Sequence, residues 1–262
     1  MEKLNRFFAK NYYAVYIVCS ILSFVVYVLL WQTVGLLALL IACALIYLSA
    51  AWLASRSGRL LKNPGQILEN QCDPYPYLEE VQRQRDYSGP WTLKYNRTML
   101  EATALVLVGQ PEQAYQMLTP MQEKVFKSRF TALQLVYSGA MVSVCRALDR
   151  VYEVENWQAK YMELLPKLKN KRLKQVYTDG LPMALALYHT FRKEHELSQQ
   201  HLQQFTPKSM YDRVHVAVVS AENNIAMGET EKAKEALRFV VENGNKLHVV
   251  ILARQMLEEL EN

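Results

Sequence analysis

The chain has 262 residues, a formal net charge of +5 and an apolar fraction of 51%. No Asp, Glu, Lys or Arg occurs between residues 11 and 55, and the positive excess lies just outside that stretch. Residues 63–262 hold 24 basic and 24 acidic side chains, so that part of the chain is formally neutral. A nucleic-acid binder would carry a basic surface on its folded domain, and we therefore expect no nucleic-acid partner.

Two apolar stretches near the N-terminus are each long enough to cross a lipid bilayer. As helices, residues 12–31 and 34–54 would each span roughly 30 Å, at about 1.5 Å per residue, which matches the hydrocarbon core. Only Gln32 and Thr33 separate them, so the two helices must run antiparallel. The sequence predicts a hairpin of transmembrane helices over 12–31 and 34–54.

Aromatic residues support this prediction. Tyr12, Trp31 and Trp52 lie near the ends of the two stretches, and amphipathic rings favour the level of the lipid headgroups. A cleavable signal peptide and a buried soluble hairpin are the alternatives. A second full-length span directly after the first argues against a signal peptide, and so long a run without charge argues against a buried hairpin.

Basic residues flank the outer ends of the predicted hairpin, whereas its turn carries no charge. Because positively charged residues stay on the cytoplasmic side, we expect a cell-membrane protein with residues 1–11 and the C-terminal part in the cytoplasm. Four cysteines without disulfide or metal spacing agree with a reducing compartment. The membrane-flanking residues are Lys3, Arg6, Lys10, Arg56, Arg59 and Lys62.

Residues 55–90 form a predicted juxtamembrane connector with helices over 64–71 and 77–86, broken at proline and glycine residues. From residue 91 the apolar spacing is helical to the end, and strand-type alternation is absent. The helix over 173–191 is expected to kink or split near Gly180 and Pro182. The last helix is expected to cap the domain, with an interaction helix for a partner as the alternative. The predicted helices are 93–108, 111–121, 127–151, 155–168, 173–191, 195–204, 210–227, 229–243 and 247–260.

Two of the predicted helix pairs share one pattern of small and apolar residues. The first reads Thr98, Ala102, Leu105, Gly109, Ala114, Leu118 and Met121, and the second reads Ala217, Ala221, Asn224, Gly228, Ala233, Leu237 and Val240. This pattern resembles the tetratricopeptide repeat (TPR), a helix–turn–helix unit of about 34 residues. The predicted repeat-packing residues are Ala102, Gly109, Ala114, Leu118, Ala221, Gly228, Ala233 and Leu237.

The resemblance implies a TPR-like α-solenoid over residues 91–262, in which small residues let paired helices approach closely and glycine makes the turn. Thr98 and Ala217 stand where that family has tryptophan, and the closing proline is absent from both units. Between the two units, Ala147 and Ala159 are the best candidates for the small positions. The expected fold class is all-α, with a transmembrane hairpin followed by this helical-repeat domain.

No motif for catalysis, a cofactor or a metal ion is found, so we expect none of these sites. His189, Glu194, His195 and His201 come nearest to a metal site, but six-residue spacing puts successive histidines on different helix faces. The acidic residues Glu79, Glu80, Asp86 and Glu101 are expected to be surface charges. The basic run 167–174 is read as a solvated turn, with contact to anionic lipid as the alternative.

These features favour a membrane-anchored scaffold that binds a protein partner through a cytoplasmic TPR-like domain. The first alternative is a structural subunit of a membrane complex whose contacts are made by the transmembrane hairpin. The second is a component of a small enzyme or transporter, although the predicted spans carry no charge for an ion path. The sequence does not identify the partner.

Overall fold

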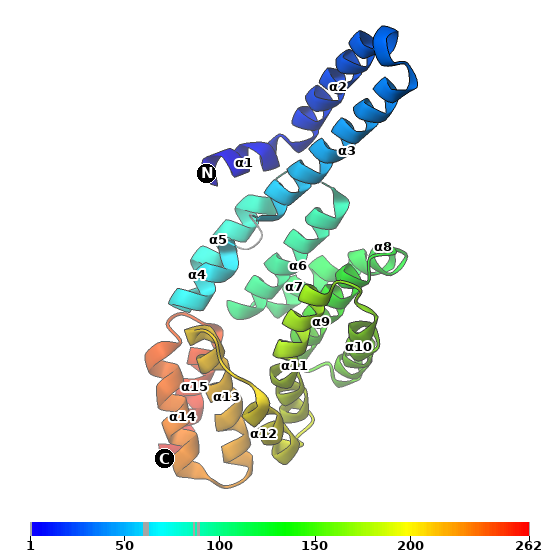
Figure 1. The fold of residues 1–262 in the computed structure, drawn as a ribbon. Coiled ribbons are helices and arrows are strands. Elements are labelled where there is room, and N and C mark those ends of the chain that lie inside the picture. Colours follow the sequence, from blue (N-terminus) through cyan, green and yellow to red (C-terminus); the bar gives the residue numbers. More distant parts are fainter. Residues whose placement is uncertain (1, 60–62, 86, 88–89, 262) are drawn as a thin grey trace. The chain divides into compact units, whose positions relative to one another are not determined.

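The structure, a computed structural model, describes residues 2–59, 63–85, 87 and 90–261 (Figure 1). These residues form helices and connecting turns without any strand, which confirms the all-α prediction. The chain divides into two compact units. The anchor unit comprises Met1–Pro64 and Glu80–Arg97, and the helix-pair unit comprises Gly65–Glu79 and Thr98–Asn262.

The anchor unit begins with a short helix, α1 (Glu2–Lys10), and continues into a long hairpin of α2 (Tyr12–Val34) and α3 (Leu36–Arg59). The turn was expected at residues 32–33 but lies at Gly35, which has a φ of 54°. Nothing at 32–33 breaks the helix, whereas glycine adopts this left-handed conformation without a steric cost. Its N–H closes α2 by donating to the carbonyl of Trp31 at 3.0 Å.

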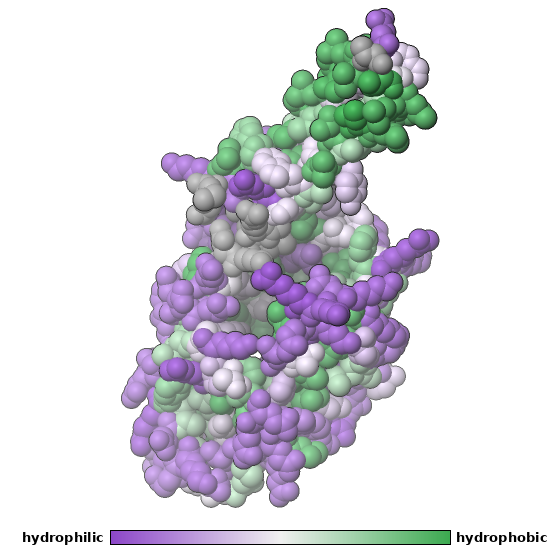
Figure 2. Space-filling model, in the orientation of Figure 1, coloured by the Kyte–Doolittle hydropathy of each residue, from purple (hydrophilic) through white to green (hydrophobic). Residues whose placement is uncertain are grey.

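Both hairpin helices are long and apolar enough to cross a membrane, over Tyr12–Gln32 and Leu36–Arg56. Only 6% of the most apolar window in α2 and 17% of that in α3 is buried, unlike the core helices of a globular domain. The buried positions of α3 include the small residues Ala38 and Ala42, which allow close helix approach. Figure 2 shows the largely apolar surface on the visible face of the hairpin.

Aromatic and charged side chains hold α1 against the end of the hairpin. The ring of Phe8 meets Trp52 edge to face at 4.9 Å between centroids, and the Arg56 guanidinium lies 5.1 Å from the centre of the Trp52 ring. Arg56 also donates to Asn5 Oδ1 at 3.0 Å. These contacts fix α1 at the open end of the hairpin.

The Glu80 carboxylate belongs to the same unit and is buried, so its expected role as a surface charge is wrong. It accepts hydrogen bonds from Arg6 at 3.4 Å and from Gln84 at 2.9 Å, and it pairs with Arg83. Glu101, in the other unit, is also buried, whereas Glu79 is exposed as expected. Asp86 lies outside the described residues.

Two connector helices follow, α4 (Asn63–Gln71) and α5 (Pro74–Arg85). The helix α5 was expected to begin at residue 77, after two prolines. It begins at Pro74 because the first helical turn has no intrahelical use for the N–H groups that proline lacks. The side chain of Asp73 supports this start by accepting a hydrogen bond from the Tyr75 N–H at 3.1 Å.

The helix-pair unit contains four consecutive helix pairs and a final helix, and the first helix, α6, belongs to this unit from Thr98 onward. The pairs are α6 (Trp91–Leu107) with α7 (Pro111–Leu118), α9 (Thr131–Ala147) with α10 (Val151–Leu164), α11 (Lys171–Phe191) with α12 (His195–Gln204), and α13 (Met210–Ala226) with α14 (Thr230–Asn243). The final helix is α15 (His248–Glu261), and short segments η2 (Thr119–Met121), α8 (Gln122–Phe126) and η3 (Leu165–Lys167) extend two of the pairs.

Most of the predicted helices are found, but two predictions in the middle of the domain are wrong. The helix expected over 127–151 spans only Thr131–Ala147, and the one expected from residue 155 begins at Val151. Both errors arise because the turn between them contains no glycine. The helix α11 continues past Gly180 and Pro182 as one helix, so of the predicted kink or split the split does not occur, and the kink stays a prediction.

All four pairs turn in the same way. One residue adopts a left-handed conformation, with φ between 55° and 81°, and the second helix of the pair begins two residues later. The next N–H donates to the carbonyl five residues back at 2.8–2.9 Å, and the left-handed residue donates to the carbonyl three residues back at 2.9–3.1 Å. This is the Schellman arrangement of a helix C-terminus. The four turn residues are Gly109, Asp149, Lys193 and Gly228.

The shared turn defines equivalent buried positions in the four pairs. Five residues after the turn residue stands a fully buried side chain, namely Ala114, Val154, Ser198 or Ala233. Nine residues after it stands Leu118, Gln158, Leu202 or Leu237, and all four are also buried. Ala147 and Ala159, the candidates from the sequence, are exposed instead. The second pair therefore uses Val154 where two other pairs have alanine.

Candidate functional site

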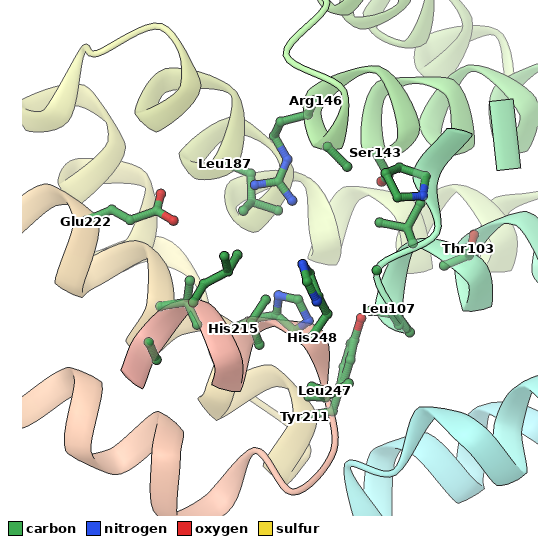
Figure 3. Close-up of a pocket in the computed structure, with 18 of the residues that line it drawn as sticks. Thr103, Leu107, Ser143, Arg146, Leu187, Tyr211, His215, Glu222, Leu247 and His248 are labelled. Atoms are coloured by element: carbon green, nitrogen blue, oxygen red, sulfur yellow. The ribbon is translucent and has the colours of Figure 1, made fainter. Parts of the chain in front are cut away.

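A cavity of about 460 Å³ lies in the helix-pair unit (Figure 3). The first helix of each pair contributes to its wall, as does α15. Such a volume lies within the range of roughly 300–1,000 Å³ typical of small-ligand pockets. Most of the lining side chains are apolar, and the ionisable ones are Arg146, Tyr211, Asp212, His215, Glu222 and His248.

Arg146 stands in the last turn of α9 and is the only charged residue of that helix. Its guanidinium extends into the cavity, as does the carboxylate of Glu222 on α13 (Figure 3). Within the described part of the chain, Arg146 forms no hydrogen bond or ion pair. Burial lowers the pKa of its guanidinium, and the negative charge of Glu222 partly offsets that effect.

The pKa of Glu222 is shifted in the opposite direction from that of Arg146. Burial raises the pKa of its carboxyl group, while the positive charge of Arg146 acts to lower it. Desolvation disfavours whichever form is charged, so it raises the pKa of an acid and lowers that of a base. The cavity thus contains one cation and one carboxyl group that do not form a direct ion pair.

His215 and Tyr211, one helical turn apart on α13, add two neutral polar groups. Burial, reinforced by Arg146, lowers the pKa of His215 to about 4, although Asp212 opposes the shift. Burial raises the pKa of Tyr211. Nε2 of His215 is buried and has no hydrogen-bond partner among the described residues. Near neutral pH both side chains are therefore uncharged.

Asp212 also lines the cavity, but its carboxylate is already engaged. Its Oδ2 accepts hydrogen bonds from the N–H groups of Lys208 at 2.8 Å and Ser209 at 3.1 Å. The hydroxyl of Ser209 accepts in turn from the Asp212 N–H at 3.0 Å. This reciprocal capping box fixes the N-terminus of α13 and thereby the positions of Tyr211 and His215.

The last helix, α15, closes the cavity against the turn of the first pair. His248, the first residue of α15, lies so close to Gly109 that a Cβ added there would be 2.7 Å from its Nδ1. Nearby, Lys246 pairs with Asp73 at 3.0 Å and the Asn245 side chain donates to the carbonyl of Gln71 at 2.9 Å. The last helix is therefore held to the first pair and to the end of α4.

A second polar cluster joins the third and fourth pairs. The hydroxyl groups of Thr190 and Ser198 are 2.7 Å apart, and Asn223 bonds to both at 3.0 and 2.8 Å. Ser198 also donates to the carbonyl of Ala186 at 2.9 Å, and His195 Nδ1 lies 3.0 Å from Asn223 Oδ1. Every member has a defined role in holding α11, α12 and α13 together, so this cluster is structural.

The histidines that the sequence placed on separate faces are partly brought together. The chain reverses between α11 and α12, so the His189 ring stacks on His201 with 5.1 Å between centroids. Nδ1 of His189 also lies 2.7 Å from Glu194 Oε2. The spacing argument compared only successive histidines, and the pair that meets, His189 with His201, is not successive. Among the described residues, no three potential metal ligands gather into a metal-binding group.

Glu153 joins the first and second pairs. Its carboxylate accepts hydrogen bonds from Tyr115 at 3.0 Å and Arg150 at 3.1 Å, and the Cys145 thiol lies 3.7 Å away. Burial, with the nearby carboxylate of Glu153, raises the pKa of Cys145 to about 12. A thiol with so high a pKa is a poor nucleophile, so this cysteine serves packing.

The structure places the sequence-predicted residues as follows. The six repeat-packing residues other than glycine are all buried, and Gly109 and Gly228 both make turns. Of the membrane-flanking residues, Lys3 and Lys10 are exposed, and Arg6 and Arg56 make the contacts described above. Arg59 ends α3, and Lys62 lies outside the described residues. The cavity residues were not predicted, although a lone arginine in the apolar helix α9 was a visible signal.

Comparison of the chain with protein-family models, with curated proteins and with solved structures finds no match.

Proposed function

We propose that the protein is a membrane-anchored scaffold whose helix-pair unit binds a protein partner at the cytoplasmic face of the cell membrane. The observation that carries this proposal is the hairpin of α2 and α3, whose apolar side chains are exposed over lengths that match a bilayer. Exposed apolar surface on that scale is costly in water and favourable in lipid. The basic residues at the open end of the hairpin support cytoplasmic termini.

The four helix pairs support the binding role. Their common turn and equivalent buried positions are features of a TPR-like array, and such arrays use extended surfaces to bind other proteins. We further propose that the protein is not an enzyme. In the cavity, His215 and Tyr211 do not titrate near neutral pH, and the Thr103 hydroxyl is engaged with the Met99 carbonyl at 3.0 Å.

The anchor is tested first, with the full chain expressed in cells. It should remain in the membrane pellet after alkaline carbonate extraction, and a tag after Asn262 should be reached by antibody only after the membrane is permeabilised. A tag accessible in intact cells would contradict the proposed orientation. Extraction of the full chain by carbonate would contradict the anchor itself.

The binding role is tested by cross-linking in cells, with one variant that separates the two parts of the chain. In that variant, an unrelated two-helix membrane hairpin replaces residues 12–54. If the helix-pair unit binds the partner, the same protein should cross-link to the wild type and to the variant. Loss of the partner from a variant that still reaches the membrane would favour a structural subunit whose hairpin makes the contacts.

A further inference from the structure

Arg146 is a cation without a counter-ion in the described structure. Its side chain carries five N–H donors, lines a partly open and largely apolar cavity, and has its pKa lowered by burial. Arg146 is half-buried, and an unpaired charge that is partly removed from water carries a cost that a ligand or another side chain can offset. The question is which group pairs with Arg146.

The carboxylates of the protein itself do not fill this role. Asp212 is held in the capping box at the start of α13. Glu222 faces the cavity but forms no ion pair with Arg146 among the described residues, and burial raises the pKa of its carboxyl group. The unpartnered Nε2 of His215 lines the same space. The space between these side chains can therefore hold one hydrogen-bond-accepting group of a ligand, with donors on Arg146 and His215.

The rest of the wall is suited to an apolar body. Leu107, Leu187 and Val218 contribute branched side chains, and Met183 and Met256 contribute flexible ones. Methionine adapts its shape to varied ligands. The cavity volume of about 460 Å³ admits a small molecule rather than a folded segment of protein.

We propose that this cavity binds a small amphiphilic carboxylate, with its anionic group held by Arg146 and its hydrocarbon chain among the apolar side chains. A single negative charge matches the single guanidinium, whereas a phosphate dianion would leave a buried charge uncompensated beside Glu222. A guanidinium binds a carboxylate through two parallel hydrogen bonds. This site does not depend on whether a protein partner is found.

The probes are octanoate, 1-octanol and octylammonium, which share a hydrocarbon chain and differ in charge. Binding is measured by isothermal titration calorimetry to the full chain in lipid nanodiscs, with empty nanodiscs subtracted. Octanoate should bind, and octanol and octylammonium should each bind at least 10-fold more weakly, because hydrogen bonds to a charged group are worth about a factor of ten or more. Equal binding of octanoate and octanol would overturn the proposal.

Two variants assign the polar contacts. Arg146→Gln should weaken octanoate by about 10-fold or more and leave octanol unchanged. Glu222→Gln should strengthen octanoate, because it removes the competing negative charge. If Glu222→Gln instead weakens binding, or if octylammonium binds most tightly, the cavity selects a cation and the proposal is wrong.

Folding is controlled by circular dichroism of each variant and by Arg146→Lys, which keeps the charge and should retain more octanoate binding than Arg146→Gln. A further readout is independent of affinity. The carbon-13 signal of carboxyl-labelled octanoate should titrate at a lower pH when bound to the wild type than when free, because the guanidinium stabilises the carboxylate. An unchanged or raised carboxyl pKa in the bound state would contradict contact with Arg146.

Discussion

Gly109 and His248 are in direct contact, so that a Cβ atom on Gly109 would lie only 2.7 Å from Nδ1 of the imidazole. Gly109 also has a φ of 81°. Two independent constraints, backbone conformation and close approach, thus coincide at the turn of the first pair. Gly228 makes the equivalent turn of the fourth pair with a φ of 75°, but nothing lies within 4 Å of its Cβ position.

This difference predicts unequal effects of two alanine substitutions. Gly228→Ala should cost about 1–2 kcal/mol of unfolding free energy, because only the left-handed conformation is strained. Gly109→Ala should cost more, since His248 must also move. Thermal unfolding of the full chain in detergent, followed by circular dichroism, measures both. Adding His248→Ala should relieve part of the Gly109→Ala effect and none of the Gly228→Ala effect; equal losses in the two single variants would refute the contact.

Lys193 makes the third turn with a φ of 60°, in a conformation that disfavours a lysine side chain. We predict that Lys193→Gly stabilises the protein by about 1 kcal/mol, because glycine removes that strain. The control is Gln200→Gly in the exposed middle of α12, which should destabilise by about 1 kcal/mol. Chemical denaturation distinguishes the two signs. A loss of stability in Lys193→Gly would argue against the left-handed turn.

Asn223 connects Thr190 and Ser198 in the buried cluster between the third and fourth pairs. Asn223→Leu should cost roughly 1–3 kcal/mol, because both hydroxyl groups lose a buried partner. Asn224→Ala is the control, since that neighbouring side chain forms no hydrogen bond in the described part of the chain. The unfolding midpoints of the two variants should therefore differ clearly, with Asn223→Leu lower. Similar midpoints would mean that the cluster contributes little.

His215 predicts how stability depends on pH. Its pKa is about 4 in the folded chain and 6.5 in the reference state, so the unfolded chain binds more protons between these values. Stability should fall as the pH is lowered from about 6.5 to about 4, by up to about 3 kcal/mol. The raised pKa of Glu222 acts in the opposite direction, so comparison with His215→Gln isolates the histidine. A parallel pH profile in that variant would disprove the contribution.

Leu22 and Ile251 are both exposed apolar residues, one on α2 and the other on α15. If α2 crosses lipid, Leu22→Arg should oppose insertion by about 2.5–3.5 kcal/mol, whereas Ile251→Arg should be neutral. The fraction of each variant that resists carbonate extraction reports the difference. Full retention of Leu22→Arg in the membrane would count against a spanning position near the middle of α2.

The sequence revealed the first and fourth helix pairs because glycine marks their turns. It missed the boundary within the second pair because Asp149 holds the same left-handed conformation without glycine, whereas the third turn, at Lys193, was predicted correctly between the helices 173–191 and 195–204. The small-residue pattern failed in those pairs for a related reason. Val154 and Ser198 occupy the position where the other pairs have alanine, and neither residue type signals close helix approach.

The cavity was beyond sequence reasoning for a different reason. Its charged and polar residues lie on helices separated by long stretches of chain, and only the folded arrangement brings Arg146 near Glu222 and His215. Local periodicity describes one helix at a time and contains no information about such distances. The apolar hairpin, in contrast, was predictable because length and composition alone define it.

The contact of His248 with Gly109 also limits how this domain can change in evolution. An array with free ends can gain or lose a unit by duplication or deletion without disturbing the units that remain. Here the last helix is fastened to the first turn, so an inserted pair would pull these two residues apart and open the wall of the cavity. We therefore expect the copy number of helix pairs to stay at four in any variant that keeps the site.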